Sequence, residues 1–464
     1  MTAILQGAQG RGVSADTALS LGEKFFQSNE IVPLALPGTE QRFTTQEVLR
    51  LEKEVLDIAK EMAGKPTQTV SLPKVDFPIS DEQRIALGSI LGSTPGSLTL
   101  LRGIAGAGKT TVFKAAHQAW KNHGLEVLGA ALSGKAASEL KKASGIEAQT
   151  LHSLLWEISV GVRVLSPKTV LVVDEAAMVG TRQLLAVLKA CHEAGARCVL
   201  AGDDRQLQAV EHGGGFSALL NRLPSSTLTE IFRQKEVWAR EAVKEFSTGH
   251  ANAAFAAYQE RKLVAEALTE PEALARLIND WRTRGGIHNP ASHVILAPTN
   301  NVVDELNLLA QAQRLQEQIL APQAVDSGGI RYFVGDRVIF THNSREFGVW
   351  NGDTGTIQGI KDGKLVVSLD SQVMREIDLG RYQHLKLGYA MTVNRAQGST
   401  LDNSLVYAAN QNRELADVEA SRARQSTRWY LSESADKVTE AMAESKKKEF
   451  VTEMVATLEQ TLTL

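Results

Sequence analysis

Apolar and polar positions follow two different periods along the central part of the chain. Four short apolar runs are bounded by turn residues, as strands are, and they lie at 98–102, 126–131, 170–173 and 198–201. Between them, apolar residues recur every three or four positions, which is the spacing of one helix face. This alternation predicts a parallel sheet with helices on both faces. A second region of the same texture spans 241–318, with a strand at 293–297.

The first 75 residues have a mixed pattern that predicts a small N-terminal unit. We expect a helix over 14–26, followed by two strands joined by the turn Pro37-Gly38. An amphipathic helix begins at Thr45, and the prolines of 65–78 indicate a linker. The two strands, from Ile31 to Thr44, resemble the wing of a winged-helix unit whose earlier helices are missing.

Between 329 and 377 the pattern changes to short β-rich runs separated by Gly-Asp, Asn-Gly and Asp-Gly dipeptides. These dipeptides favour tight hairpins, so we expect a small antiparallel barrel inserted in the second α/β region. The α/β texture returns at 389–393 and 404–407. The segment 437–464 has the spacing of an amphipathic helical tail and carries the lysine run 446–448.

Composition excludes several classes of protein. The 464 residues are enough for about three structural units, and 43% hydrophobic with 22% charged residues is typical of globular chains. Two cysteines, Cys191 and Cys198, exclude a disulfide scaffold and a cysteine zinc site, and we expect both to be buried thiols. No apolar run approaches the length of a membrane span. The net charge of −3 gives no sign of the basic footprint of nucleic-acid binding.

One glycine-rich segment predicts a phosphate site. Residues Gly103 to Thr110 match G-x-x-x-x-G-K-[ST], after an apolar strand and before a helix. Such a loop wraps backbone N–H groups around a phosphate at a helix N-terminus. Lys109 would contact the β and γ phosphates of ATP, and the Thr110 hydroxyl would bind Mg²⁺. A glycine-rich turn with a chance lysine is the alternative, and the flanking strand and helix argue against it.

Polar residues after two further strands suit hydrolysis at the γ phosphate. Asp174 and Glu175 end an all-apolar run, where Asp174 would hold Mg²⁺ and Glu175 would orient or deprotonate the attacking water. Alone, such a pair is more often a solvated loop. Gln206 follows the next strand and suits a sensor of phosphate or water. Arg233 and Arg422 are candidates to stabilise charge on the γ-phosphoryl group, although lone arginines are usually solvated.

These segments occur in an order that resembles superfamily 1 helicases of the RecD-like branch (SF1B), and most of all the helicase portion of conjugative relaxase–helicases. The resemblance covers about 44–430. The matching segments are Ser80 to Gln83, Gly103 to Thr110, Ser133 to Ala137, Thr150 to Leu154, Asp174-Glu175, Gly202 to Leu207, Arg233, Gly388 to Thr400 and Ser421 to Arg424.

The resemblance implies an α/β fold of two RecA-like P-loop NTPase domains, a small SH3-like β-barrel and a partial winged-helix-like N-terminal segment. The expected division is 1–75 for the N-terminal segment, 76–230 for domain 1A with the ATP site, 231–328 with 386–434 for domain 2A, 329–385 for barrel 2B, and 435–464 for the tail. We expect both arginines to reach the ATP from the second domain.

The resemblance also implies roles for single residues. The catalytic residues would be Lys109, Glu175, Gln206, Arg233 and Arg422. The nucleotide would be held by Gln83, Gly103, Gly106, Ala107, Gly108, Lys109, Thr110, Thr111, Gln397 and Gly398, with Gln83 reading the adenine. Mg²⁺ would lie on Thr110 and Asp174. Single-stranded DNA would be contacted by Ser133, His152, Thr299, Asn300, Thr392 and Asn394.

The implied function is ATP-dependent translocation on single-stranded DNA, with 5′→3′ polarity, in conjugative DNA transfer. We expect a monomer in the bacterial cytoplasm that works with other conjugative transfer proteins. In relaxases, winged-helix units precede the helicase, so we also expect this chain to be a piece of a larger protein. His342, Trp350 and Phe340 are candidate platforms for DNA bases, although Phe340 could equally be barrel core and Trp350 could plug a turn.

Two departures from the family pattern keep an alternative open. Asn394 and Ser421 stand where the family usually has His and Thr. There is also little room between His152 and Pro167 for the pin that separates duplex strands in RecD-like enzymes. The alternative is an ATP-gated module that binds or loads single-stranded DNA without robust unwinding. A nucleotide kinase would not need Gln83, Gln206 or the segment from Gly388 to Thr400.

Overall fold

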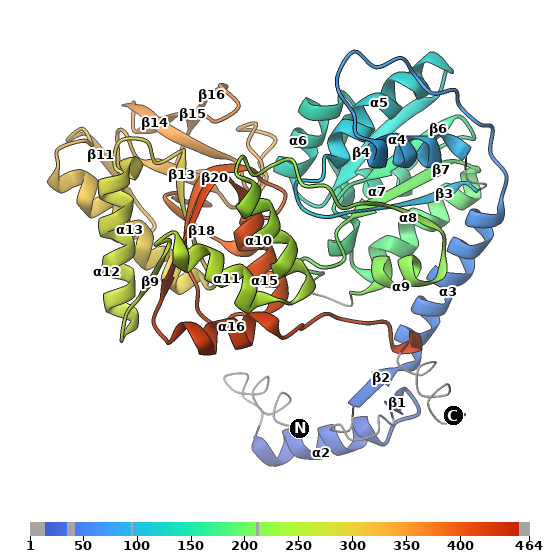
Figure 1. Cartoon of the computed structure of the whole chain (residues 1–464), viewed down its shortest axis with the longest axis horizontal. Helices are drawn as coiled ribbons and strands as arrows, with labels where there is room; N and C mark the ends of the chain where they lie inside the picture. Colours follow the sequence, from blue (N-terminus) through green and yellow to red (C-terminus); the bar gives the residue numbers. More distant parts are fainter. Residues whose placement is uncertain (1–13, 35–41, 94–95, 210–212, 454–464) are drawn as a thin grey trace.

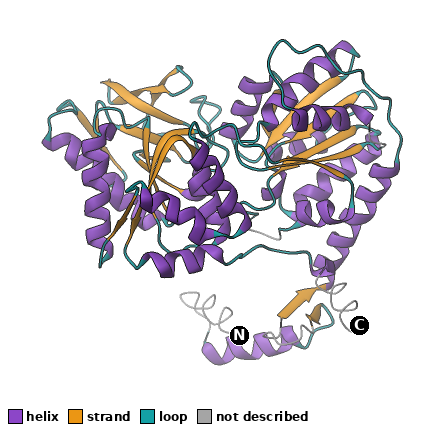
Figure 2. Cartoon of the chain, viewed as in Figure 1, coloured by secondary structure: helices purple, strands orange, loops and turns teal. Residues whose placement is uncertain are grey.

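A computed structural model describes residues 14–34, 42–93, 96–209 and 213–453. Two α/β units lie side by side, each with a sheet between helices, as Figure 1 shows and Figure 2 repeats by element type. This arrangement confirms the alternation of strands and helices that the sequence predicted.

Within the described residues, the first sheet has six parallel strands in the order β5-β4-β6-β7-β3-β8. The central strand β6 is buried at every position, which explains its uninterrupted apolar run. The strands are β3 (Leu98–Gly103), β4 (Glu126–Ala131), β5 (Glu147–Thr150), β6 (Thr169–Val173), β7 (Arg197–Gly202) and β8 (Ser225–Leu228). The helices are α4 (Asp81–Gly88), α5 (Lys109–Asn122), α6 (Gly134–Ser144), α7 (Leu151–Ser159), α8 (Thr181–Ala194) and α9 (Gly215–Arg222).

The second sheet is also parallel, and the described chain gives it five strands in the order β18-β10-β19-β20-β9. The strands are β9 (Val264–Glu266), β10 (His293–Ala297), β18 (Ala390–Thr392), β19 (Leu401–Tyr407) and β20 (Ala423–Leu431). The helices are α10 (Val237–Thr248), α11 (Ala251–Glu260), α12 (Glu270–Trp281), α13 (Asn300–Gln316), α14 (Val393–Ala396), α15 (Arg413–Arg422) and α16 (Ala435–Ala443).

An antiparallel insertion separates α13 from β18. It contains the hairpin β11 (Ala324–Ser327) with β12 (Ile330–Phe333) and a sheet in the order β16-β15-β14-β13-β17. The sheet strands are β13 (Arg337–Phe340), β14 (Thr354–Lys361), β15 (Lys364–Leu369), β16 (Met374–Ile377) and β17 (Leu385–Leu387). Asp362 and Gly363 both have positive φ, 50° and 74°, as the predicted tight turn requires. An antiparallel insertion is therefore confirmed, and its SH3-like character stays a prediction.

The N-terminal unit contains α2 (Ala15–Phe26), the antiparallel pair β1 (Ile31–Leu34) and β2 (Arg42–Thr45), and α3 (Gln46–Gly64). Thr45 caps α3, where its hydroxyl accepts from the N–H of Val48. The helix α3 packs against α8 of the first unit. The predicted turn Pro37-Gly38 lies outside the described residues, and the winged-helix interpretation stays a prediction.

The predicted C-terminal helix is wrong over residues 444–450. The helix α16 ends at Ala443, and Glu444 has the extended angles φ −78° and ψ 126°. The lysine run then follows an extended path that leads away from α16 toward α9 and α3 (Figure 1). The N–H groups of Lys446 and Lys448 bond to side chains far away in the sequence, so the local amphipathic spacing did not decide the conformation.

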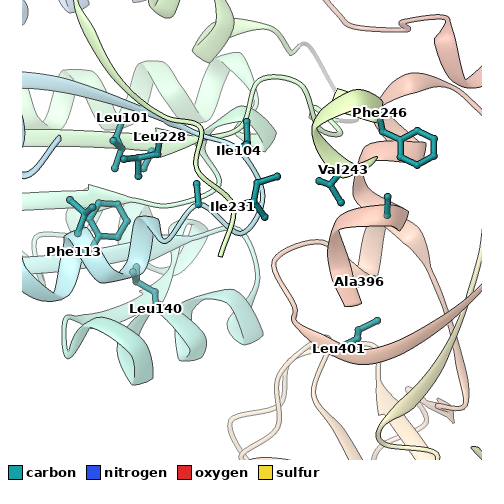
Figure 3. Packing of buried hydrophobic residues seen from close by; sticks show 14 of the residues in the cluster. Leu101, Ile104, Phe113, Leu140, Leu228, Ile231, Val243, Phe246, Ala396 and Leu401 are labelled. Carbon is teal, nitrogen blue, oxygen red and sulfur yellow. The ribbon is translucent and has the colours of Figure 1, made fainter. Parts of the chain in front are cut away.

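The two units share buried apolar surface. Ile104 and Ile231 from the first unit face Val243 and Ala396 from the second, as Figure 3 shows, and all four belong to one buried cluster. Both cysteines are buried, Cys191 on α8 and Cys198 on β7, as expected. Among the described residues, no helix is long and apolar enough to cross a membrane.

Candidate nucleotide-binding site

A cavity of about 560 Å³ lies where the two units meet. The loop from Ala105 to Thr110 lines one wall, and Gly398, Arg422 and Arg424 line the other. The loop follows β3 and ends at the N-terminus of α5, so the positive end of the helix dipole faces this cavity. The structure therefore brings together residues that the sequence places about 300 positions apart.

The glycines of the loop are required by close contacts. Gly106 and Gly108 have φ of 81° and 78°, which favour glycine. A side chain on Gly106 would come within 2.7 Å of the Arg233 Cβ, and one on Gly103 within 2.7 Å of the Lys109 Cγ. The Lys109 ammonium donates to the Gly103 carbonyl at 2.8 Å, which holds it over the loop.

Gln83 lies against the phosphate loop and is 5% exposed. Its Oε1 accepts from the Ser80 N–H at 3.0 Å, and its Nε2 donates to the Ala107 carbonyl at 3.3 Å. The first bond belongs to a capping box that begins α4. Gln83 thus supports the phosphate loop through the Ala107 carbonyl. Its contact with adenine stays a prediction.

Asp174 and Glu175 directly follow β6, and they line the same cavity as Lys109. The Asp174 Oδ1 accepts from the Glu175 N–H at 2.9 Å, and Glu175 has the left-handed φ of 53°. Burial, together with the neighbouring Glu175 charge, raises the pKa of Asp174 to about 6. Carboxylates crowded in this way favour a cation, and carboxylate and hydroxyl oxygens are the ligands that Mg²⁺ prefers. Asp174 and Thr110, which line the same cavity, therefore fit the metal role.

Gln206 joins the two units. It is 1% exposed, and its Oε1 accepts from the Arg422 Nη2 at 3.2 Å. The Arg422 side chain, 2% exposed, also donates to the Val418 carbonyl and the Ser421 hydroxyl. A residue after β7 of the first sheet is thus bonded to the end of α15, which packs on the second sheet. A change in the separation of the units would alter this contact directly.

Arg233 lies on the connection between β8 and α10, and its Cβ is close to Gly106 of the phosphate loop. The expectation that it reaches in from the second domain is therefore wrong, because this connection packs on the loop of the first unit. The Arg233 Nη1 donates to the Ser421 carbonyl at 2.9 Å, and burial lowers the pKa of its guanidinium. Its neighbour Gln234 donates to the carbonyls of Ser421 and Ala423. The Gln397 Nε2 donates to the Leu207 carbonyl at 3.4 Å. Arg233 and Gln234 are thus bonded to the junction of α15 and β20, whereas Gln397 is bonded to the loop after β7.

Sequence reasoning missed two acids at this site. Glu139, on α6, lines the cavity, and burial raises the pKa of its carboxyl although Lys135 and Arg233 lower it. Asp203 is 1% exposed, and its Oδ2 accepts from the N–H of Ala105 in the phosphate loop at 3.0 Å. Glu139 follows the segment Ser133 to Ala137 on the same helix, so helical spacing could have found it. The contact between Asp203 and the phosphate loop is seen only in the structure.

The candidate DNA residues lie where strands end and helices begin. Ser133, Thr299 and Thr392 are N-cap residues of α6, α13 and α14, and each hydroxyl accepts from the helix backbone. His152 and Asn300 lie exposed in the first turns of α7 and α13. Ser133 and Asn394 line a second cavity of about 180 Å³ with Asn351 of the insertion. His152, Thr299 and Asn300 do not line that cavity.

The three aromatic candidates of the insertion have different environments. Phe340 is fully buried, so the barrel-core alternative is correct and it is no base platform. His342 is exposed and stacks on His384 at 3.8 Å between ring centroids. Trp350 is 39% exposed, and its Cβ lies so close to Gly134 that a side chain there would approach within 2.7 Å. Trp350 therefore holds the insertion against α6 of the first unit.

Residues 78–269 match the family described as AAA domain. The chain is 34% identical to the conjugal transfer protein TraA of Agrobacterium fabrum over 84% of this chain and 36% of TraA. It is 30% identical to the ATP-dependent RecD2 DNA helicase of Deinococcus radiodurans over 83% of this chain and 54% of that helicase. The chain thus spans about a third of the length of TraA and half of that of RecD2.

Among solved structures, the Pif1 helicase of Bacteroides bound to single-stranded DNA is similar, with a TM-score of 0.52 and 18% identity. The match covers 76% of this chain and 92% of the Pif1 chain. The Pif1 helicase of Candida albicans matches with a TM-score of 0.50 and 18% identity. These likenesses concern the fold alone, and they support two α/β domains with parallel sheets.

Proposed function

We propose that this chain, a relative of the RecD-like superfamily 1 helicases and of conjugal transfer proteins, is an ATP-driven motor on single-stranded DNA. One observation carries the proposal: the cavity has a phosphate loop and acids on one wall and arginines on the other. Nucleotide bound there would touch both units. Binding and hydrolysis would therefore change the separation of the units, which is how such a fold converts ATP into movement.

The residues divide the work of hydrolysis. The amides of the phosphate loop and Lys109 would bind the β and γ phosphates, and Lys109 would exchange the Gly103 carbonyl for phosphate oxygens. A Mg²⁺ ion on Thr110 and Asp174 would neutralise phosphate charge. Glu175 would orient or deprotonate the attacking water. Arg422 and Arg233 would stabilise charge on the transferred group, while Gln206 would report the state of the nucleotide to Arg422.

DNA would lie across the strand ends of both sheets. Four helices begin at these strand ends, namely α6, α7, α13 and α14. Helix N-termini favour phosphate groups. Ser133, His152, Thr299, Asn300, Thr392 and Asn394 would supply the contacts. The 5′→3′ direction follows from the resemblance to the RecD-like branch, and a monomer suffices because one chain holds both walls of the cavity.

A role in conjugation follows from the relatives. The match to TraA covers about a third of that protein, so we propose that this chain acts as the motor part of conjugative DNA transfer, together with other transfer proteins.

One feature favours the second candidate, a module that loads single-stranded DNA without robust unwinding. Only nine residues, 160–168, connect α7 to β6, where RecD-like enzymes carry the strand-separating pin. Such a module would bind DNA in response to ATP without displacing a strand.

The test is ATP hydrolysis by the full chain with and without single-stranded DNA. We expect DNA to stimulate hydrolysis, and Glu175→Gln to abolish turnover while ATP binding persists, because only the water-activating group is lost. Hydrolysis that survives both Lys109→Ala and Glu175→Gln would exclude the motor and the loading module alike. ATP-dependent DNA binding with full hydrolysis but no movement would favour the loading module.

A further inference from the structure

The segment 444–453 forms a strap between the two units. It leaves α16 beside the second sheet and crosses to α9 and α3 of the first unit (Figure 1). The strap contacts both units, and one of its contacts lies close to the nucleotide cavity.

On the second unit, Glu414 of α15 holds the start of the strap. Glu414 is 5% exposed and accepts from the Ser445 hydroxyl and, at 3.0 Å, from the Lys446 N–H. The Arg413 guanidinium also donates to the Ala443 carbonyl at 2.6 Å. The strap is therefore attached to the helix that ends in Arg422.

On the first unit, the strap is held by side chains and by a buried ring. The Lys448 N–H donates to the Gln208 Oε1 at 2.6 Å, and its ammonium donates to the Ala209 carbonyl at 2.7 Å. Phe450 is fully buried and belongs to the same hydrophobic cluster as Leu184 and Phe216. The next two N–H groups, of residues 451 and 452, donate to the carboxylate of Glu52 on α3.

Between these anchors, Lys447 reaches the loop that carries Gln206. Its ammonium lies 2.9 Å from the Asp204 Oδ2, and the Arg102 Nε lies 2.7 Å from the Asp204 Oδ1. Asp204 is 5% exposed, and these two cations hold the pKa of its carboxyl below the usual range despite its burial. The preceding residue, Asp203, accepts from the phosphate loop at Ala105. Asp204 thus connects the loop that carries Gln206 to the strap, through Lys447, and to β3, through Arg102.

We propose that Lys447 is a positioning residue for ATP hydrolysis: by pairing with Asp204 it holds the Gln206 loop in register with Arg422, and the strap couples the two units. This inference rests on the proposed function. Without Lys447, Asp204 keeps the ion pair with Arg102, and the loop from Asp203 to Gln206 loses its link to the strap. The bond between Gln206 and Arg422 then remains without this support from the strap. Nucleotide binding depends on the phosphate loop itself and is unaffected, so the loss falls on turnover.

The test compares Lys447→Ala with Lys447→Arg and Lys446→Ala in the full chain. Lys446 is exposed and contacts Glu414 through its backbone N–H, so it is a matched control of equal charge. We expect Lys447→Ala to lower the DNA-stimulated kcat for ATP three- to tenfold with KM unchanged within twofold. Lys447→Arg should retain at least half of kcat, and Lys446→Ala should match the wild type. Asp204→Asn combined with Lys447→Ala should be no worse than the more severe single variant.

Several outcomes would overturn the inference. They are an unchanged kcat in Lys447→Ala, an equal fall in Lys446→Ala, a lower Tm without a change in kcat, or a rise in kcat, which would make the strap a restraint. Failure of the proposed function would look different, because hydrolysis would then survive Lys109→Ala in the same assay.

Discussion

The two α/β units share one architecture and differ in chemistry. Each has a parallel sheet between helices, as Figure 1 shows. Only the first has a phosphate loop, between β3 and α5, and acids after β6. At the corresponding seam the second supplies Arg422 and the turn at Gly398. The fold alone therefore does not make an active site.

From this difference we expect nucleotide binding to depend on the first unit and turnover to depend on contacts between the two units. Lys109 and Asp174 lie within one unit, whereas the bond from Arg422 to Gln206 crosses between units. Substitutions on the first wall should remove nucleotide chemistry altogether. Those on the second wall should leave binding intact and slow turnover.

The largest effect is expected on the first wall. Lys109→Ala removes the cation that contacts the phosphates, and we expect ATP hydrolysis to fall by about a thousandfold or more. The measurement is steady-state phosphate release with saturating single-stranded DNA. The Tm should stay within a few degrees, because the ammonium is bonded only to a loop carbonyl of Gly103 among the described contacts. Residual hydrolysis above a tenth of the wild type would contradict the assignment.

The second wall is tested by Arg422→Ala. We expect kcat to fall about a hundredfold while ATP affinity changes less than threefold, because an arginine that stabilises the transition state contributes little to binding. Equilibrium binding of a fluorescent ATP analogue separates the two quantities. Arg282→Ala is the control, since Arg282 pairs with Glu317 at 3.0 Å outside the cavity. Equal losses of binding and turnover would make Arg422 a part of the binding wall instead.

A buried acid in the second unit predicts a pH effect on stability. Burial raises the pKa of Glu419 to about 8 from 4.5, so between these pH values the folded state holds a proton that the unfolded state releases. Stability contributed by this group is therefore lost as the pH rises through this window. Because one pKa unit corresponds to about 1.4 kcal/mol, Glu419→Gln should be stabilising by about 5 kcal/mol at pH 9 and nearly neutral at pH 5. Denaturant titrations of both proteins at the two pH values give the difference, and a difference independent of pH would contradict the burial argument.

The smallest effect concerns the contact between the insertion and α6. Trp350→Ala removes the ring that packs on Gly134, and we expect affinity for single-stranded DNA to fall three- to tenfold with basal ATP hydrolysis unchanged. Fluorescence anisotropy of a labelled oligonucleotide measures this. Trp238→Ala is the matched control, because Trp238 stacks on Arg261, with 4.4 Å from the guanidinium to the ring centroid. Equal affinities in the two variants would remove Trp350 from the DNA path.

Local patterns predicted most of the fold. The strand at 126–131 and the strand at 293–297 have the predicted bounds, because an apolar run between turn residues is a local signal. The phosphate loop was equally readable, since its glycines and Lys109 are contiguous. The pairing of Asp362 with Gly363 correctly predicted a tight turn.

Contacts between remote segments were not predictable in this way. The tail was expected to be helical, yet Phe450 is buried against α8 and α9, and Glu52 and Glu414 bond to the strap backbone. Each of these partners lies far away in the sequence. The role of Gln83 in supporting Ala107, the position of Glu139 in the cavity, and the burial of Phe340 likewise depend on packing that no single segment encodes.

The central claim is that ATP hydrolysis between the two units drives movement along single-stranded DNA, and the most direct measurement is strand displacement from duplexes with either a 5′ or a 3′ tail. The wild-type chain with ATP and Mg²⁺ is expected to displace a strand, or a protein block on the tail, from the 5′-tailed substrate only, and Glu175→Gln is expected to displace neither. Hydrolysis that DNA does not stimulate, together with no displacement from either substrate, would contradict the account.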